Sequence, residues 1–382
     1  APAARAVCVK QQRWIQYRSG RISIQDYKTA EKKAKKELRK SRRNFEKSLT
    51  RGMRKNPKRF FSYINSKSKR SSVGPLIDGD GNTLVTDLDM ANEFNRCFAS
   101  VFGNDGNIPD TPPQLSSDKL ITTVQFPPEV VEAKLLALKP SSAPGPDKLH
   151  PRILRECAHE LSTPLSIIFT KSMSNGILPA DWKRTHISPI FKKGHRHCAA
   201  NYRPINIASV PAKVMESIIK DALLAHLRDN NLIRKSQHGF LPQRSCTTNL
   251  IDYLNVVTKA LDKGASYDVL LIDFQKAFDK VPFDGMLAKA KSHGISDNLL
   301  EWLKNWTNNR RQRVVLNGTE SEWANVLSSV VQGSVLGPIL FLLNDLDLAI
   351  QAADDKIYIS KFADDTKVGR EITNAIDLCQ IF

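Results

Sequence analysis

The sequence predicts a mixed α/β protein of the α+β type. Strand-like and helix-like segments alternate through most of the chain, with apolar residues recurring at a period of two in the first and near 3.6 in the second. A short apolar run at 269–272 is typical of a strand, and a second strand-like stretch surrounds 357–368. The N-terminal 70 residues differ from the rest because Lys and Arg dominate a helix-forming pattern. We therefore expect a basic helical arm followed by a larger α/β body.

Two adjacent acids, Asp364 and Asp365, interrupt the second strand-like stretch. Ile357-Tyr358-Ile359 precedes them and Val368 follows, a pattern that predicts a tight hairpin turn. Like charges side by side raise each other's pKa unless a cation lies between them and a third acid. A divalent metal ion is the usual solution, although an adjacent acid pair in a turn is common and is weak support for metal binding by itself.

A third acid, Asp273, ends the apolar run at 269–272, which is typical of a strand buried on both faces. Asp273, Asp364 and Asp365 are therefore the predicted catalytic and metal-binding residues. Their oxygen ligands suit two hard cations, one activating an attacking hydroxyl and the other stabilising a leaving phosphate oxygen.

The positive charge belongs to the N-terminal segment. The chain carries a formal net charge of +18, and residues 1–70 hold 23 of its 57 Lys and Arg but only 4 of its 39 Asp and Glu. Such a block predicts a polyanionic partner and salt-sensitive binding. The predicted helix at 26–53 is either a solvated linker or a phosphate-contacting arm, and the two are compatible. Cations and aromatics interleave at 56–64, which suits stacking on bases or docking on another domain.

Neither a zinc site nor a disulfide framework is predicted, because the six cysteines show no paired spacing. His195 and His197 beside Cys198 are metal donors or part of a polar loop, and the loop is favoured. The chain has no run of about 18 apolar residues and no signal peptide. We expect an intracellular protein that is not secreted and has no membrane partner.

Three blocks, in this order and spacing, resemble the reverse transcriptase of non-LTR (LINE-type) retrotransposons. They are Asp273-Phe274-Gln275-Lys276-Ala277-Phe278-Asp279, Gln332-Gly333-Ser334-Val335-Leu336-Gly337-Pro338 and Phe362-Ala363-Asp364-Asp365. Pro144-Gly145-Pro146-Asp147 is similar to the block that opens the fingers of these polymerases, and Gln237-His238-Gly239-Phe240 to their template-facing turn. The resemblance covers nearly the whole chain, with its specific motifs between about Pro144 and Asp365.

The resemblance implies polymerase fingers and part of a palm built on a mainly antiparallel sheet. We expect a basic helical arm at 1–70, a segment with a helix and a Pro-rich loop at 71–140, and fingers with a truncated palm at 141–382. A thumb and a preceding endonuclease are expected to be absent from this chain.

The resemblance also implies an RNA-directed DNA polymerase that adds a deoxynucleotide to a primer 3′-hydroxyl. Its partners would be an RNA template, a DNA primer and a dNTP, with two Mg²⁺ ions (or Mn²⁺) as cofactors, in a retroelement particle of the nucleus or cytoplasm. Lys192 and Arg203 match the positions that hold the triphosphate. Phe278 matches the aromatic that excludes a 2′-hydroxyl, and Gln332 and Gly333 match the block that supports the nucleotide.

Two departures from the family pattern favour an alternative. Val331 stands where the family usually has proline. The family also usually has a few more apolar residues between Leu342-Leu343 and Asn344-Asp345, and their loss would change the register of the second half of this helix. The alternative is a truncated, catalytically inactive remnant that binds nucleic acid through residues 1–70. A group II intron-type or viral polymerase is less favoured, because the basic arm and the Pro144 and Asp364 blocks together are LINE-like.

Overall fold

The computed structural model describes residues 2–54, 56–57, 60–61, 63–64, 73–103, 119–329, 333–343, 346–347, 350 and 356–372. The chain divides into two compact units, Ala1–Ser72 and Val73–Phe382. Helices combine with mainly antiparallel sheets, as predicted. Most of the predicted Pro-rich loop, at 104–118, lies outside the described residues.

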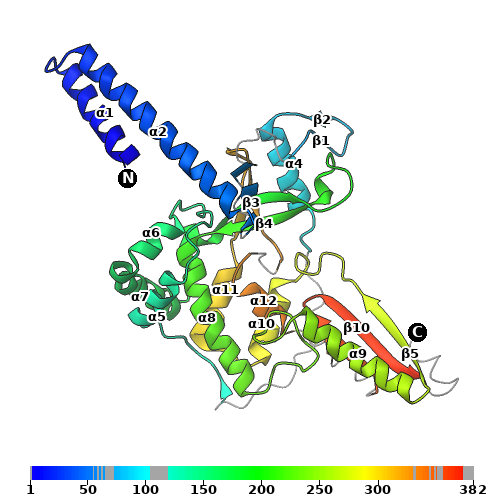
Figure 1. Ribbon diagram of the computed structural model, residues 1–382. Helices are drawn as coiled ribbons and strands as arrows, with labels where there is room; N and C mark the ends of the chain where they lie inside the picture. Colours follow the sequence, from blue (N-terminus) through cyan, green and yellow to red (C-terminus); the bar gives the residue numbers. More distant parts are fainter. Residues whose placement is uncertain are drawn as a thin grey trace. The chain divides into compact units, whose positions relative to one another are not determined.

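The first unit contains a helical hairpin of α1 (Pro2–Arg18) and α2 (Ile24–Gly52), drawn in blue in Figure 1. Ser23 and Asp26 form a capping box that starts α2. The rings of Trp14, Tyr17 and Tyr27 cluster at centroid separations of 5.0 to 6.3 Å and join the two helices near their connection. The predicted helix is confirmed, and its Lys and Arg side chains lie mostly on the exposed surface.

The second unit begins with a small hairpin and a helix that packs on a five-stranded sheet. Phe94 and Phe98 of the helix join Ile187, Tyr202 and Val314 of the sheet in a buried cluster. The sheet order is β4-β3-β6-β7 with β8 beside β6, and all pairs except β3 with β6 are antiparallel. The elements are β1 (Leu76–Ile77), β2 (Thr83–Leu84), α4 (Asp87–Ala99), β3 (Arg184–Phe191), β4 (Tyr202–Ala208), β6 (Arg311–Leu316), β7 (Thr319–Glu320) and β8 (Ala324–Asn325).

A helical layer encloses the main core, in which Trp302 and Trp306 are completely buried. Both tryptophans are therefore core residues. The helical stretch from 151 to 175 is divided in two at Cys157, whose backbone leaves the helical region. The layer consists of α5 (Pro128–Leu136), α6 (Pro151–Glu156), α7 (Ala158–Asn175), α8 (Val210–Asp229), α10 (Phe283–Ser292), α11 (Asp297–Thr307) and α12 (Gly337–Phe341), with the short helix η2 (Ala180–Lys183). The short helix η3 (Ala199–Asn201) packs instead with α4 in the other buried cluster.

A three-stranded antiparallel sheet, in the order β5-β10-β9, completes the fold. Its strands are β5 (Ser266–Ile272), β9 (Tyr358–Phe362) and β10 (Asp365–Ile372), and Figure 1 shows α9 (Cys246–Asp262) running along it. The predicted strand at 269–272 is confirmed, but its predicted burial on both faces is wrong, since Val269 is 39% and Leu271 68% exposed. Among the described residues β5 pairs with β10 alone, so it forms an edge of the sheet.

A close backbone approach explains the glycine in the block at 144–147. A Cβ on Gly145 would lie 2.7 Å from the carbonyl carbon and oxygen of Ala208 and from the nitrogen of Ser209. The Asp147 carboxylate accepts a 2.7 Å hydrogen bond from the Ser209 hydroxyl. The block is therefore fixed against the junction of β4 and α8, which positions the sheet relative to the helical layer.

We predict that Gly145→Ala lowers the free energy of unfolding by about 1 to 3 kcal/mol, because the new methyl group overlaps backbone atoms that cannot rotate away. Urea denaturation measures the change. Gly74→Ala is the control, since a Cβ there meets nothing within 4 Å. Equal midpoints for the two variants would contradict the packing argument.

Candidate active site

The two adjacent acids lie at the turn of the β9–β10 hairpin. Phe362 pairs with Asp365, so Ala363 and Asp364 form a two-residue connection. Ala363 has a φ of 60°, a left-handed conformation that short hairpin turns require. The predicted tight hairpin is therefore confirmed, with Asp364 at its tip and Asp365 at the start of β10.

The third acid lies at the end of the neighbouring strand. β10 pairs with β5 in a register that sets Thr366 opposite Ile272, so Asp365 and Asp273 are the next residues along the two strands. Burial raises the pKa of Asp364, the charges of Asp365 and Asp273 raise it further, and Arg203 opposes the shift. The structure thus brings three acids and one cation within electrostatic range of each other.

The carboxylates of these acids are suitable ligands for a divalent cation, although their side chains do not come together as a complete set of metal ligands. Carboxylate oxygens are hard ligands, and a cation relieves the repulsion that raises the Asp364 pKa. Within the described ranges, no three His, Cys, Asp or Glu side chains are close enough to hold a metal ion. That statement includes His195 and His197, whose rings stack at 5.3 Å.

A turn at 236–239 packs against the acid-bearing hairpin and stabilises it. The Gln237 side-chain oxygen accepts hydrogen bonds from the backbone N–H of Gly239 at 2.8 Å and of Ala363 at 3.1 Å. The His238 N–H also donates to the Lys361 carbonyl at 2.8 Å. A Cβ on Gly239 would lie 2.4 Å from the Ala363 nitrogen, so glycine is needed for this contact. The turn predicted to face the template therefore packs on the acid-bearing hairpin.

A buried ion pair, Lys361 with Asp347, also fixes the hairpin. The Lys361 ammonium lies 2.6 Å from the Asp347 carboxylate, with the two side chains 2% and 4% exposed. The Ser236 hydroxyl donates to the same carboxylate. Sequence reasoning missed this pair. The available signal was a lysine inside an otherwise apolar strand.

The two predicted triphosphate-binding cations belong to the β3–β4 hairpin. Arg203 pairs with Ile190, and the Lys192 N–H donates to the Asn201 carbonyl at 2.9 Å. Because side chains alternate along a strand, Ile190, Lys192 and Arg203 share one face, and all three are exposed. The effect of Arg203 on Asp364 indicates that its guanidinium is near the acids.

The remaining predicted nucleotide-site residues lie on two loops. Phe278 is half-buried, with its ring 4.6 Å from that of Phe341 and 6.1 Å from that of Phe240. Gly333 has a φ of 85°, and a Cβ there would lie 2.7 Å from the Asn206 carbonyl oxygen. Gln332 lies outside the described residues, as do Val331 and the Asn344-Asp345 pair next to the shortened helix.

Comparison with known proteins agrees with this geometry. Residues 190–379 match the sequence profile described as reverse transcriptase (RNA-dependent DNA polymerase). The chain belongs to the reverse transcriptase family, in the branch of the non-LTR retrotransposons. Every predicted reverse transcriptase site residue, from Lys192 to Asp365, falls inside the matched region.

Three relatives show how much of a reverse transcriptase protein this chain represents. It is 30% identical over 246 residues to the RNA-directed DNA polymerase from mobile element jockey of Drosophila funebris, covering 63% of this chain and 27% of the relative. For the probable polymerases of transposon X-element and transposon BS of Drosophila melanogaster, identity is 27% over 79% of this chain and 29% over 62%. The aligned parts span 34% and 27% of those two relatives, so the chain matches only a portion of each.

Family membership carries two general statements. Reverse transcriptases use divalent metal ions, and they act on a nucleic-acid template and primer. Separately, none of the helices in the described ranges is both long enough and apolar enough to span a bilayer.

We predict that Asp364→Asn stabilises the fold at pH 8. The pKa of Asp364 is raised in the folded state, so above that pKa its ionised carboxylate lowers the stability of the fold. At low pH the carboxyl group is protonated in both the folded and the unfolded chain, and it then has no effect on stability. The gain is under about 1 kcal/mol because solvent screens the partly exposed group. The gain is lost as the pH falls from 8 through the raised pKa of Asp364 to its ordinary value of 3.8.

Urea midpoints measured across this pH range test the prediction, with Asp80→Asn, in the exposed β1–β2 turn, as the control. A loss of stability at pH 8, or a gain independent of pH, would show that Asp364 is not destabilised by its acidic neighbours.

Proposed function

We propose that this chain is the fingers and partial palm of an RNA-directed DNA polymerase of a non-LTR retrotransposon. The observation that carries the proposal is the β5-β10-β9 register, which sets Asp273 beside the hairpin of Asp364 and Asp365. Its substrates are an RNA template, a DNA primer and a dNTP, and it acts inside the cell. The proposed domains are the basic arm at 1–70, a connecting segment at 71–140, and fingers with partial palm at 141–382.

The proposed reaction is in-line attack of the primer 3′-hydroxyl on the α-phosphate of the dNTP. Asp273, Asp364 and Asp365 would hold two Mg²⁺ ions, which lower the pKa of the attacking hydroxyl and neutralise charge on the leaving pyrophosphate. The acids suit this role because bound cations would offset both the burial that raises the pKa of Asp364 and the smaller repulsion from Asp365 and Asp273. The turn at 236–239 keeps the hairpin in place during the reaction.

Five further residues bind and select the dNTP in this proposal. Lys192 and Arg203 contact the β- and γ-phosphates from the exposed face of the β3–β4 hairpin. Phe278, held by Phe240 and Phe341, presents a ring edge that collides with a 2′-hydroxyl. Gly333, with Gln332 before it, brings the backbone close to the nucleotide.

We predict that the chain extends a DNA primer on an RNA template with Mg²⁺, and that Asp364→Asn lowers the rate by at least about 10³-fold, because a missing metal ligand removes stabilisation of the developing charge. Incorporation of labelled dNTP measures the rate. Asp229→Asn, on the exposed end of α8, is the control and keeps the full rate. Extension that survives in Asp364→Asn excludes the proposed chemistry.

The α1–α2 hairpin favours a second function, which is nucleic-acid binding. This function also belongs to the alternative in which the chain is an inactive remnant. Along α2, eleven Lys and Arg occupy a broad face opposite the thin apolar stripe, and only Ala34 and Leu49 of this helix are buried. An exposed basic helix fits the phosphates of a nucleic acid. The arm would then bind nucleic acid whether or not the polymerase site is active.

We predict that replacing three exposed cations by Lys36→Glu, Lys40→Glu and Arg43→Glu weakens nucleic-acid binding. It should also reduce the slope of log K against log salt by about 2 to 3, since each lost phosphate contact contributes about 0.7 to 0.9. Fluorescence anisotropy at several salt concentrations measures the slope. The matched control exchanges Lys for Arg and Arg for Lys at these positions, and an unchanged slope in the Glu variant would place the binding elsewhere.

A further inference from the structure

Glu216 is a buried carboxylate that joins two distant parts of the chain. It lies on α8 and is 3% exposed. One of its oxygens accepts a 2.9 Å hydrogen bond from the Trp306 indole N–H, and the other accepts a 2.8 Å bond from the Val335 backbone N–H. A charged group at this depth is costly unless both oxygens are satisfied, so the two bonds are strong and specific.

The Val335 bond acts on the segment that carries Gly333. Gly333 lies against β4 so closely that a Cβ would be 2.7 Å from the Asn206 carbonyl oxygen. Two residues later the chain is tied to Glu216, and the Ser334 hydroxyl accepts from the Gly337 N–H at 3.0 Å to start α12. The main chain from Gly333 to Val335 is therefore fixed between β4 on one side and α8 on the other.

Arg310 supplies a buried positive charge near Glu216. It is 2% exposed, its guanidinium donates to the Trp306 carbonyl at 3.0 Å, and it lies over the Trp306 ring at 5.1 Å. Burial lowers the pKa of Arg310, and the Glu216 charge opposes that shift. Trp306 thus contacts both charges, through its indole N–H and its carbonyl.

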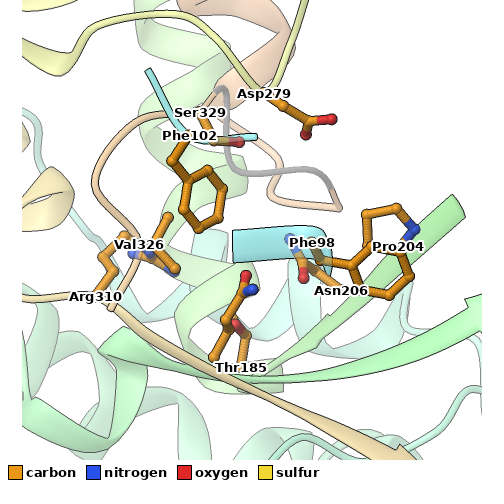
Figure 2. Close-up of a pocket in the computed structure, with 10 residues that line it drawn as sticks. Phe98, Phe102, Thr185, Pro204, Asn206, Asp279, Arg310, Val326 and Ser329 are labelled. Atoms are coloured by element: carbon orange, nitrogen blue, oxygen red, sulfur yellow. The ribbon is translucent and has the colours of Figure 1, made fainter. Parts of the chain in front are cut away.

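A small cavity separates Arg310 from Asn206, and Figure 2 shows both side chains at its wall together with Asp279. Its volume of about 20 Å³ has room for about one water molecule, which excludes a nucleotide. This cavity is therefore not a nucleotide site, and the buried Glu216 acts on the Gly333 segment through the Val335 N–H.

We propose that Glu216 is a positioning residue for dNTP binding, which holds Gly333 beside the strand of Arg203 by anchoring the main chain at Val335. The inference rests on the proposed polymerase function, because it assigns a role to a residue that does not touch the substrate. A purely structural Glu216 would affect stability without a selective effect on the dNTP.

The central variant is Glu216→Gln, which keeps the side-chain volume but offers one acceptor oxygen to two N–H donors. We expect the KM for dNTP to rise about tenfold, because a charge-assisted hydrogen bond to the segment is lost. The kcat and the affinity for primer–template should stay within about twofold. Asp229→Asn is the matched carboxylate-to-amide control on the same helix and should change none of these values.

A rescue experiment separates the Val335 bond from the Trp306 bond. Adding Trp306→Phe to Glu216→Gln removes one donor, so the single amide oxygen is free to turn to Val335. We expect the KM of the double variant to return to within about threefold of the unsubstituted chain, although its thermal stability is lower. A KM that stays high in the double variant, or never rises in Glu216→Gln, overturns the proposal.

Hydrogen exchange at the Val335 amide, measured without substrate, gives a readout that is independent of polymerase activity. Exchange should be at least about tenfold faster in Glu216→Gln and slow again in the double variant. If Glu216→Gln does not fold, Glu216→Asp, which keeps the charge but shortens the side chain, should accelerate exchange in the same direction. If exchange at Val335 is unchanged in Glu216→Gln, the anchoring role of Glu216 is overturned. If exchange changes as expected but the unsubstituted chain does not extend a primer, only the proposed polymerase function is overturned.

Discussion

The antiparallel register of β5, β10 and β9 is the constraint on which the rest of the site depends. Side chains alternate with a period of two, so a slip by one residue would move Asp365 to the opposite face of the sheet. The register is held by the pairs Thr366 with Ile272 and Phe362 with Asp365. It is also held from outside the sheet, because Gln237 binds the hairpin turn and Asp347 binds Lys361. The structure therefore fixes the acids through neighbours that carry no part of the chemistry.

Sequence patterns predicted the local features of this site but not its tertiary supports. The hairpin turn and the strand before Asp273 follow from short-range signals, namely two acids between strand-like residues and an apolar run. The burial of that run was wrongly predicted, because apolarity does not distinguish a central strand from an edge strand whose neighbours decide its exposure. Lys361 with Asp347 and Glu216 with Val335 are long-range pairs. A single sequence contains no spacing rule that reveals them.

Buried charges recur at the segments that position the site, and this has an energetic consequence. Lys361 with Asp347 supports the acid-bearing hairpin. Glu216, with the opposite charge of Arg310 within electrostatic range, supports the Gly333 segment through Val335. An apolar replacement of such a pair is often neutral or stabilising, whereas removal of one partner costs about 3 to 5 kcal/mol. The pairs are thus poor sources of net stability. Their hydrogen bonds accept one geometry only, so their contribution is to the definition of the hairpin and of the loop.

The distribution of charge separates nucleic-acid attraction from catalysis. Residues 1–70 hold 23 Lys and Arg against 4 Asp and Glu, so the other 312 residues carry 34 basic and 35 acidic side chains of the totals of 57 and 39. A nearly neutral body that concentrates acids at the proposed active site would repel phosphates there unless cations intervene. Arg203 partly offsets the charge of these acids, but long-range attraction has to come from the arm. Ionic strength should therefore act mainly on template affinity, through the arm, and much less on the dNTP, whose binding depends on the short-range geometry of the two hairpins.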